Sequence, residues 1–91
     1  MQLKIPISNL PESNDDEYYS FLSAYQISKT GTWWTIMICA DTEEKRVIQI
    51  RKYRKRDGEW KKFSNFGINS SNQAKKILDA LSSLHETFYK D

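Results

Sequence analysis

The sequence predicts an α+β domain in which a four-stranded antiparallel β-sheet precedes a C-terminal α-helix, in the order ββββα. Three observations lead to this fold class. The middle of the chain alternates polar with β-branched and aromatic side chains, as half-buried strands do. Asp57-Gly58 marks a tight hairpin, and the C-terminal segment carries an apolar stripe with helical spacing. The length of 91 residues suits one domain.

The four strands are separated by short runs of turn residues. They are expected over Tyr25–Lys29, Trp33–Ala40, Lys45–Arg56 and Glu59–Phe63. Both central residues of a type I′ turn need a positive φ angle, which Asp57-Gly58 tolerates. This turn is therefore expected to place Arg56 opposite Glu59.

The C-terminal helix is indicated by apolar residues that recur every three or four positions. They are Ala74, Ile77, Leu78, Leu81, Leu84 and Phe88. Ser70 and Gln73 have the spacing of a capping box at its start. The stripe is larger than one small sheet face needs, so we expect a two-fold homodimer with Ile77, Leu81, Leu84 and Phe88 in its interface.

Residues 1–24 form an N-terminal acidic extension with a net charge of −3. Pro6 and Pro11 interrupt any regular strand pairing in its first part. The spacing of Tyr18, Phe21 and Leu22 allows a short helix near residues 15–23. We assign residues 25–91 to a single binding and dimerisation domain.

Alternation along the strands predicts what each face of the sheet carries. A turn through Asp41–Lys45 would place Ala40 opposite Arg46. One face is then apolar, covered by the C-terminal helix, and carries Ile36, Ile38, Ile48, Ile50 and Phe63. The other face interleaves rings with cations, and carries Trp33, Tyr53, Trp60, Arg51, Lys55 and Lys62.

This second face has the chemistry of a single-stranded nucleic acid site, because rings stack on bases while cations neutralise phosphates. Positions 45–62 hold nine basic and two acidic residues, a local charge of +7. Two alternatives remain: a solvated pair of surface strands, or rings packed under the N-terminal extension or a partner subunit. A register shifted by one residue would instead build the binding face around Lys52, Arg54 and Lys61.

The residue types needed for catalysis or metal binding are scarce. Cys39 is the single cysteine and His85 the single histidine, so we expect no disulfide, no metal site, no cofactor and no enzyme. No apolar run approaches the ~20 residues of a membrane helix, and the N-terminus has no secretory signal pattern. We therefore expect an intracellular protein of the cytoplasm, nucleoid or nucleus, without a membrane partner.

Several short motifs occur in an order seen in a known family. They are Tyr25-Gln26-Ile27-Ser28-Lys29, Ile48-Gln49-Ile50-Arg51-Lys52-Tyr53, Asp57-Gly58-Glu59-Trp60-Lys61 and Gly67-Ile68-Asn69. Over residues 25–85 the chain resembles the transcriptional coactivator called positive cofactor four and its prokaryotic and viral relatives. The resemblance implies a curved four-stranded sheet backed by a helix, a homodimer, and a channel for single-stranded DNA. The sequence departs from the family pattern at Thr42 and Arg54, where the family has aromatic residues.

The resemblance also implies particular contacts. It places Lys29, Arg51 and Lys61 on the nucleic acid backbone and Lys45 at the rim of the binding surface. Together with the residues chosen from alternation and charge, the full set of expected nucleic-acid-binding residues is Lys29, Trp33, Lys45, Arg46, Arg51, Tyr53, Arg54, Lys55, Trp60, Lys61 and Lys62.

The expected function is therefore largely sequence-independent binding of single-stranded DNA in transcription, replication or repair, with transcription or replication proteins as further partners. Two alternatives stay open. A basic sheet face could meet an acidic protein partner instead, and stacking with phosphate contacts would suit RNA as well as DNA.

Overall fold

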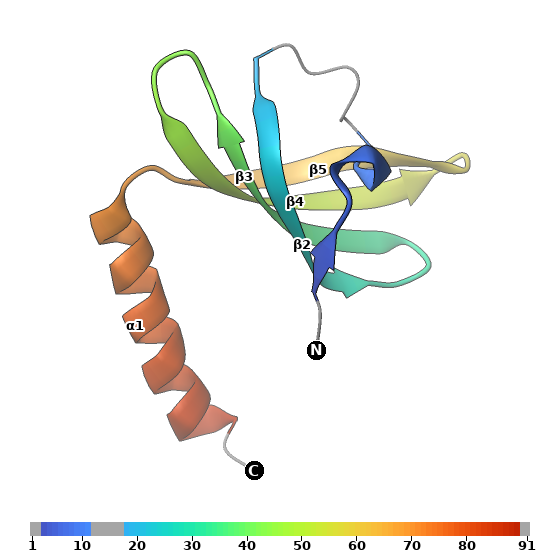
Figure 1. The fold of residues 1–91 in the computed structure, drawn as a ribbon. Coiled ribbons are helices and arrows are strands. Elements are labelled where there is room, and N and C mark those ends of the chain that lie inside the picture. Colours follow the sequence, from blue (N-terminus) through green and yellow to red (C-terminus); the bar gives the residue numbers. More distant parts are fainter. Residues whose placement is uncertain (1–2, 12–17, 90–91) are drawn as a thin grey trace.

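Five antiparallel strands form one sheet in the order β1-β2-β3-β4-β5 in the computed structural model, which describes residues 3–11 and 18–89 (Figure 1). The elements are β1 Lys4–Ile5, a 3-10 helix η1 Ile7–Asn9, β2 Ser20–Lys29, β3 Trp33–Asp41, β4 Arg46–Arg56, β5 Glu59–Ile68 and α1 Ser71–Phe88. The α+β class and the antiparallel sheet followed by a helix are confirmed. The prediction of four strands is one too few, because β1 pairs with β2.

Strand β2 begins at Ser20, earlier than the sequence suggested. Residues 20–23 of the expected helix near 15–23 are extended, so the helix is wrong there. The physical reason is pairing with β3, which buries Ala24 completely opposite Ile38 and outweighs the local helical spacing. The rest of that expected helix and the acidic residues Glu12, Asp15, Asp16 and Glu17 lie outside the described residues.

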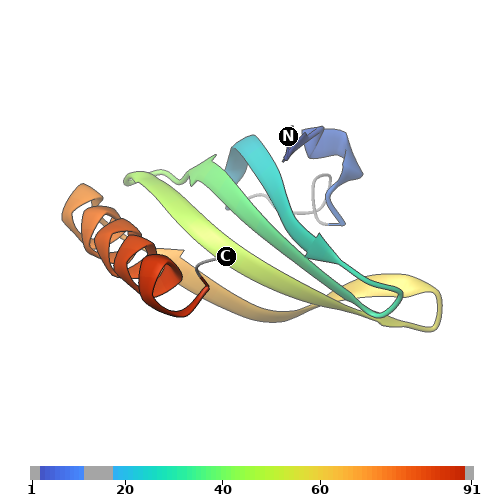
Figure 2. The same cartoon turned by 90° about the horizontal axis from the view of Figure 1, so that it is seen from below.

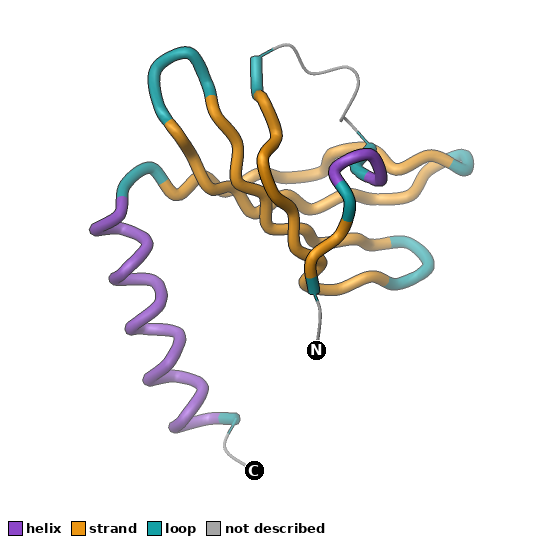
Figure 3. Tube along the Cα trace, viewed as in Figure 1, coloured by secondary structure: helices purple, strands orange, loops and turns teal. Residues whose placement is uncertain are grey.

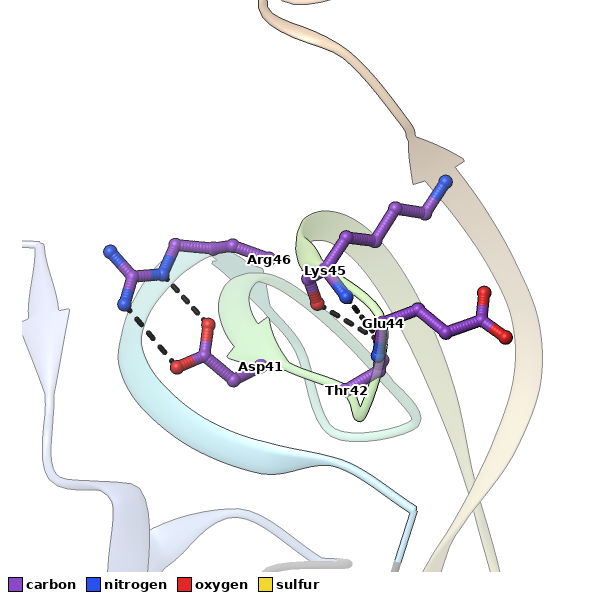
Figure 4. A network of polar contacts seen from close by, with 5 residues as sticks. All are labelled: Asp41, Thr42, Glu44, Lys45 and Arg46. Carbon is purple, nitrogen blue, oxygen red and sulfur yellow. Dashed lines mark hydrogen bonds and ion pairs between the residues drawn. The ribbon is translucent and has the colours of Figure 1, made fainter.

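The β3–β4 hairpin closes through four loop residues, Thr42–Lys45, and both ends of this loop are held by side chains (Figure 4). The Thr42 hydroxyl accepts hydrogen bonds from the Lys45 and Glu44 backbone N–H groups at 3.1 and 3.3 Å. The backbone N–H of Thr42 donates to the Lys45 carbonyl at 2.8 Å. Next to the loop, Arg46 donates to both carboxylate oxygens of Asp41 at 2.8 and 3.3 Å. The loop is therefore one residue shorter than the sequence suggested.

The shorter loop changes the register of β3 against β4. Asp41 pairs with Arg46, Ile38 with Gln49, and Ile36 with Arg51. The prediction that Ala40 faces Arg46 is wrong by one residue, since Ala40 faces Val47. Because side chains alternate along a strand, this single step moves the whole of β4 to the opposite face relative to β3.

The ion pair at the base of the loop also affects titration. The hydrogen bonds from Arg46 lower the pKa of Asp41, and the same pair raises the pKa of Arg46. A carboxylate whose pKa is lowered by folding stabilises the fold above its unfolded pKa, and this stabilisation is lost as the pH falls through the folded pKa. The Asp41–Arg46 ion pair therefore stabilises the hairpin most at pH values above the acidic range in which Asp41 is protonated.

One face of the sheet, the covered face, lies under the N-terminal segment and forms the hydrophobic core. Figure 2 shows this segment and α1 on opposite sides of the strands. Leu10 packs against the sheet, with Ile5, Ile7, Tyr19 and Phe21 around it. The buried residues beneath are Ala24, Trp34, Ile36, Ile38, Ala40 and Tyr53. The opposite side of the sheet is the open face.

The β4–β5 hairpin turns as expected and then departs from a regular ladder. Asp57 and Gly58 have φ angles of 52° and 78°, which confirms the type I′ turn, and Arg56 pairs with Glu59. A bulge follows between Lys52 and Tyr53, so that Lys52 faces Ser64 and Tyr53 faces Lys62. Phe63 is the extra residue, and its ring lies against Trp33 of the open face.

Helix α1 extends from the end of β5 away from the sheet (Figures 1 and 3). Ser70 caps its start as predicted, since its hydroxyl accepts from the Gln73 N–H at 3.0 Å. The return bond of the expected capping box is displaced by one residue, because Gln73 Oε1 accepts from the Asn69 N–H at 2.9 Å. The prediction that the helix covers the apolar face of the sheet is wrong, because Leu81 is 61% exposed and Phe88 72%. Over the described residues, no helix has the length and apolar character needed to cross a membrane.

Replacing Thr42 by valine should lower the free energy of unfolding, because the loop loses its hydroxyl acceptor while the side-chain shape is kept. The expected loss is about 1 kcal/mol, the usual net value of a hydrogen bond in a folded protein. Urea unfolding followed by circular dichroism measures it. Thr32→Val in the β2–β3 turn is the matched control, and an equal loss in both variants would contradict this role of Thr42.

Candidate nucleic-acid interface

An exposed ring and a half-buried ring meet on the open face near the β4–β5 hairpin. Trp33 of β3 and Phe63 of β5 lie edge to face, with centroids 5.0 Å apart and ring planes at 85°. Lys52 and Arg54 of β4 lie over the indole of Trp33, with Nζ 4.7 Å and Cζ 5.4 Å from the ring centroid. Phe63 is 60% exposed, so a flat surface flanked by two cations faces outward.

A groove of about 300 Å³, the open-face groove, lies beside these rings. Its lining residues are Arg54, Arg56, Lys61, Lys62 and Phe63. None of these is acidic, and within the described residues Arg54, Arg56 and Lys61 form no ion pair. The positive charge of Arg54, Arg56 and Lys61 is therefore available to an anionic ligand.

The other end of the open face is apolar and half-exposed. Met37 and Ile50 face each other on β3 and β4, and Ile50 also faces Phe66 of β5. Cys39 and Ile48 continue this surface toward the start of α1, where they line a groove of about 160 Å³ with Ala74. This end offers apolar contact area and no aromatic–cation pairs among the described residues.

The covered face carries a second aromatic–cation cluster, at the same end of the sheet as the open-face groove. Trp34 and Trp60 have ring centroids 5.5 Å apart. Lys29 lies over Trp34 with its Nζ 4.2 Å from the centroid, and Lys55 lies 5.6 Å from that of Trp60. The buried indole of Trp34 donates to Gln26 Oε1 at 3.0 Å. Trp34 is thus part of the core, while Trp60 is half-buried at its margin.

A second groove, the covered-face groove, opens between the N-terminal segment and the β4–β5 hairpin. Its volume is about 610 Å³. The lining residues are Asn9, Pro11, Trp34, Glu59, Trp60, Lys61 and Lys62. Asn9 of the 3-10 helix and Pro11 after it line one wall of this groove, and the hairpin residues line the other.

Arg51 and Tyr53 are completely buried on the covered face. Arg51 Nε donates to Gln49 Oε1 at 2.9 Å, and Gln49 Nε2 donates to the Tyr19 hydroxyl at 2.9 Å. The guanidinium of Arg51 also lies 5.1 Å from the ring centroids of both Tyr19 and Phe21. The prediction that Arg51 and Tyr53 lie on an open face is therefore wrong, and the reason is the one-residue register shift.

The expected nucleic-acid-binding residues are divided between the two faces. Six share the covered face: Lys29, Arg51, Tyr53, Lys55, Trp60 and Lys62. Trp33, Arg54 and Lys61 share the open face near Phe63. Arg46 lies at the far end of the sheet in its pair with Asp41, and Lys45 lies in the adjoining loop.

Three residues of the open-face site were missing from that expected set: Lys52, Arg56 and Phe63. The register shifted by one residue did place Lys52 on the binding face. No local feature of the sequence favoured that register over the other. Phe63 was assigned to the apolar face because a bulge cannot be recognised from alternation alone.

Among residues 3–11 and 18–89, no three His, Cys, Asp or Glu side chains come together in a way that could hold a metal ion. Cys39 is half-exposed, and His85 lies on α1 with its ring 6.4 Å from that of Tyr89.

Comparison with known proteins adds no relative. No protein-family model, no curated protein and no solved structure matches the chain. The candidate interface therefore rests on its own geometry.

Trp33 and Trp34 should differ sharply when each is replaced by alanine. Trp34→Ala empties a buried site and leaves Gln26 without its indole partner, so it should lower the free energy of unfolding by about 3–5 kcal/mol. Trp33→Ala removes a half-exposed ring and should cost clearly less. Chemical unfolding of both variants measures this difference, and equal losses would contradict the assignment of faces.

Proposed function

We propose that this chain binds single-stranded nucleic acid, DNA in the first place, without strong sequence preference. The observation that carries the proposal is the Trp33–Phe63 pair with Lys52 and Arg54 beside it, next to a groove lined by cations. An unpaired base can stack on an exposed ring, and its phosphates can meet the neighbouring cations. Because every base has a π-face, this chemistry favours no particular sequence.

The preference for single strands follows from the same geometry. Phe63 offers its ring on the surface, and a base reaches it only when that base is not already stacked in a duplex. The cations contribute salt-dependent affinity that duplexes share, so the rings provide the discrimination. RNA fits the same surface, since stacking and phosphate contacts do not involve the sugar hydroxyl.

We include two further points in this proposal. The chain is a member of the positive cofactor four family, and it acts in transcription, replication or repair inside the cell. The antiparallel sheet with a C-terminal helix is compatible with that resemblance. The proposed contacts differ from those that the resemblance implies, because Arg51 is internal and Lys52 and Phe63 take its place at the surface. No enzymatic activity is part of the proposal.

We also propose that the chain works as a homodimer. The apolar stripe of α1 is exposed from Leu78 onward, with Leu78 65%, Leu81 61% and Leu84 53% exposed. The apolar end of the open face, with Met37, Ile50 and Phe66, is uncovered too. Exposed apolar surface of this extent is typical of protein interfaces. A second copy offers a matching stripe and a matching face, which a two-fold axis brings together.

Affinity for a single-stranded oligonucleotide should fall linearly with salt on a double-logarithmic plot. The slope is expected to be about −0.7 for each phosphate contact. Lys52→Ala and Arg54→Ala should each reduce the slope by about one contact and weaken all sequences alike, because phosphates carry no sequence information. Fluorescence anisotropy at several salt concentrations, with single-stranded and duplex oligonucleotides, measures this.

Lys76→Ala is the matched control, because it removes one exposed lysine from α1, away from the grooves. Its slope should equal that of the unaltered protein. Absence of binding to single strands, together with binding of an acidic peptide, would overturn the proposal in favour of a protein-interaction module.

Sedimentation equilibrium should give a dimer at micromolar concentration. Leu81→Glu should shift the protein to the monomer, because it places a charge in the apolar stripe. Ser82→Glu adds the same charge to the neighbouring position outside the stripe and should leave the dimer intact. A stable monomer of the unaltered protein would contradict the proposed assembly.

A further inference from the structure

The two grooves at the β4–β5 hairpin meet at the free edge of the sheet. The open-face groove and the covered-face groove share two lining residues, Lys61 and Lys62. Both belong to β5, which is the last strand of the sheet and has no further strand beside it among the described residues. A chain-like ligand can therefore pass from one groove to the other around β5 without crossing the sheet.

Each groove has its own stacking surface. On the open face this is Phe63, with Trp33 against it. On the covered face it is Trp60, whose ring lies at the margin of the core and lines the groove. Lys55 lies 5.6 Å from the Trp60 centroid, and Lys29 lies 5.8 Å from it, so the second surface is also flanked by cations.

We propose that one single-stranded nucleic acid wraps around the edge strand β5, with bases stacked on Phe63 in the open-face groove and on Trp60 in the covered-face groove. Its phosphates pass the edge beside Lys61 and Lys62. This inference rests on the proposed function. It adds the path that the nucleic acid takes and a second site at which a base stacks. A polymer with a phosphate at every unit and a ring at every unit fits two basic, aromatic grooves joined by lysines.

The two stacking sites set a minimum ligand length. Trp60 and Phe63 are three residues apart, about 10 Å along a strand, and they face opposite sides of the sheet. The path around the edge is therefore longer than about 10 Å. A strand that occupies both grooves needs nucleotides in each groove and further nucleotides to pass the edge, which a 12-mer provides and a 4-mer bound in one groove does not.

Oligothymidylates of four and twelve nucleotides test the wrapped path. Phe63→Leu should weaken binding of both lengths about 5- to 150-fold, the range of one lost base–ring contact. Trp60→Leu should weaken the 12-mer by a similar factor and leave the 4-mer nearly unchanged, because the 4-mer stays in the open-face groove. Tyr89→Leu, which removes a 74% exposed ring at the end of α1, should change neither affinity.

Two further measurements keep the test decisive if Trp60→Leu is unstable. Lys55→Ala changes an exposed residue and should also weaken only the 12-mer. In the unaltered protein, a 12-mer containing 5-bromodeoxyuridine should crosslink under ultraviolet light to Phe63 or Trp33 and also to Trp60, as mapped by mass spectrometry.

The outcomes separate this inference from the proposed function. One set of results would overturn the wrapped path and leave single-strand binding in place. In it, both lengths bind and Phe63→Leu weakens both, but Trp60→Leu and Lys55→Ala have no effect and no crosslink forms at Trp60. Failure of the unaltered protein to bind either length would overturn both. Quenching of tryptophan fluorescence by an acidic peptide, without any by the 12-mer, would assign the grooves to a protein ligand and also overturn both.

Discussion

The four-residue turn between β3 and β4 decides which side chains share a face of this sheet. The Thr42 hydroxyl closes the turn on Glu44 and Lys45, and Asp41 holds Arg46 at its base. Side chains alternate along each strand, so one additional loop residue would exchange the two faces of β4 relative to β3. The β2–β3 turn uses the same device, since the Thr30 hydroxyl accepts from the Trp33 N–H at 3.0 Å. Two threonines in turns thus influence the placement of side chains far from the turns themselves.

This register gives neighbouring tryptophans opposite environments. Trp34 turns toward the N-terminal segment and joins the core, where its indole N–H is satisfied by Gln26. Trp33 turns to the open face, where Lys52 and Arg54 lie over it. An arginine is buried in the process, and its guanidinium is accommodated by Gln49 and by the rings of Tyr19 and Phe21. The basic character of β4 is therefore split, with part of it internal and the rest gathered beside the exposed Phe63.

The N-terminal segment covers one face of the sheet, and α1 does not cover the other. A sheet that is apolar on both sides needs a layer on each. Here the N-terminal segment provides a layer over Ile36 and Ile38, while α1 leaves Ile50 and Met37 uncovered and keeps its own apolar stripe exposed. The chain thus carries two unfilled apolar surfaces at one end of the sheet and a basic aromatic surface at the other. This separation leaves room for the proposed second copy and the proposed nucleic acid at the same time.

Local chemistry in the sequence was enough to predict four of the five strands, the Asp57-Gly58 turn, the Ser70 cap and the helical stripe, because each depends on residues within a few positions of one another. It also identified the basic run over positions 45–62, but not the face on which each of its side chains lies. Register, the Phe63 bulge and the burial of Arg51 were decided by tertiary structure. Two registers one residue apart both give plausible alternation, and hydrogen bonds within the Thr42 loop select between them. Which face became the core depended on where the N-terminal segment packs, and no local pattern in β3 or β4 encodes that contact.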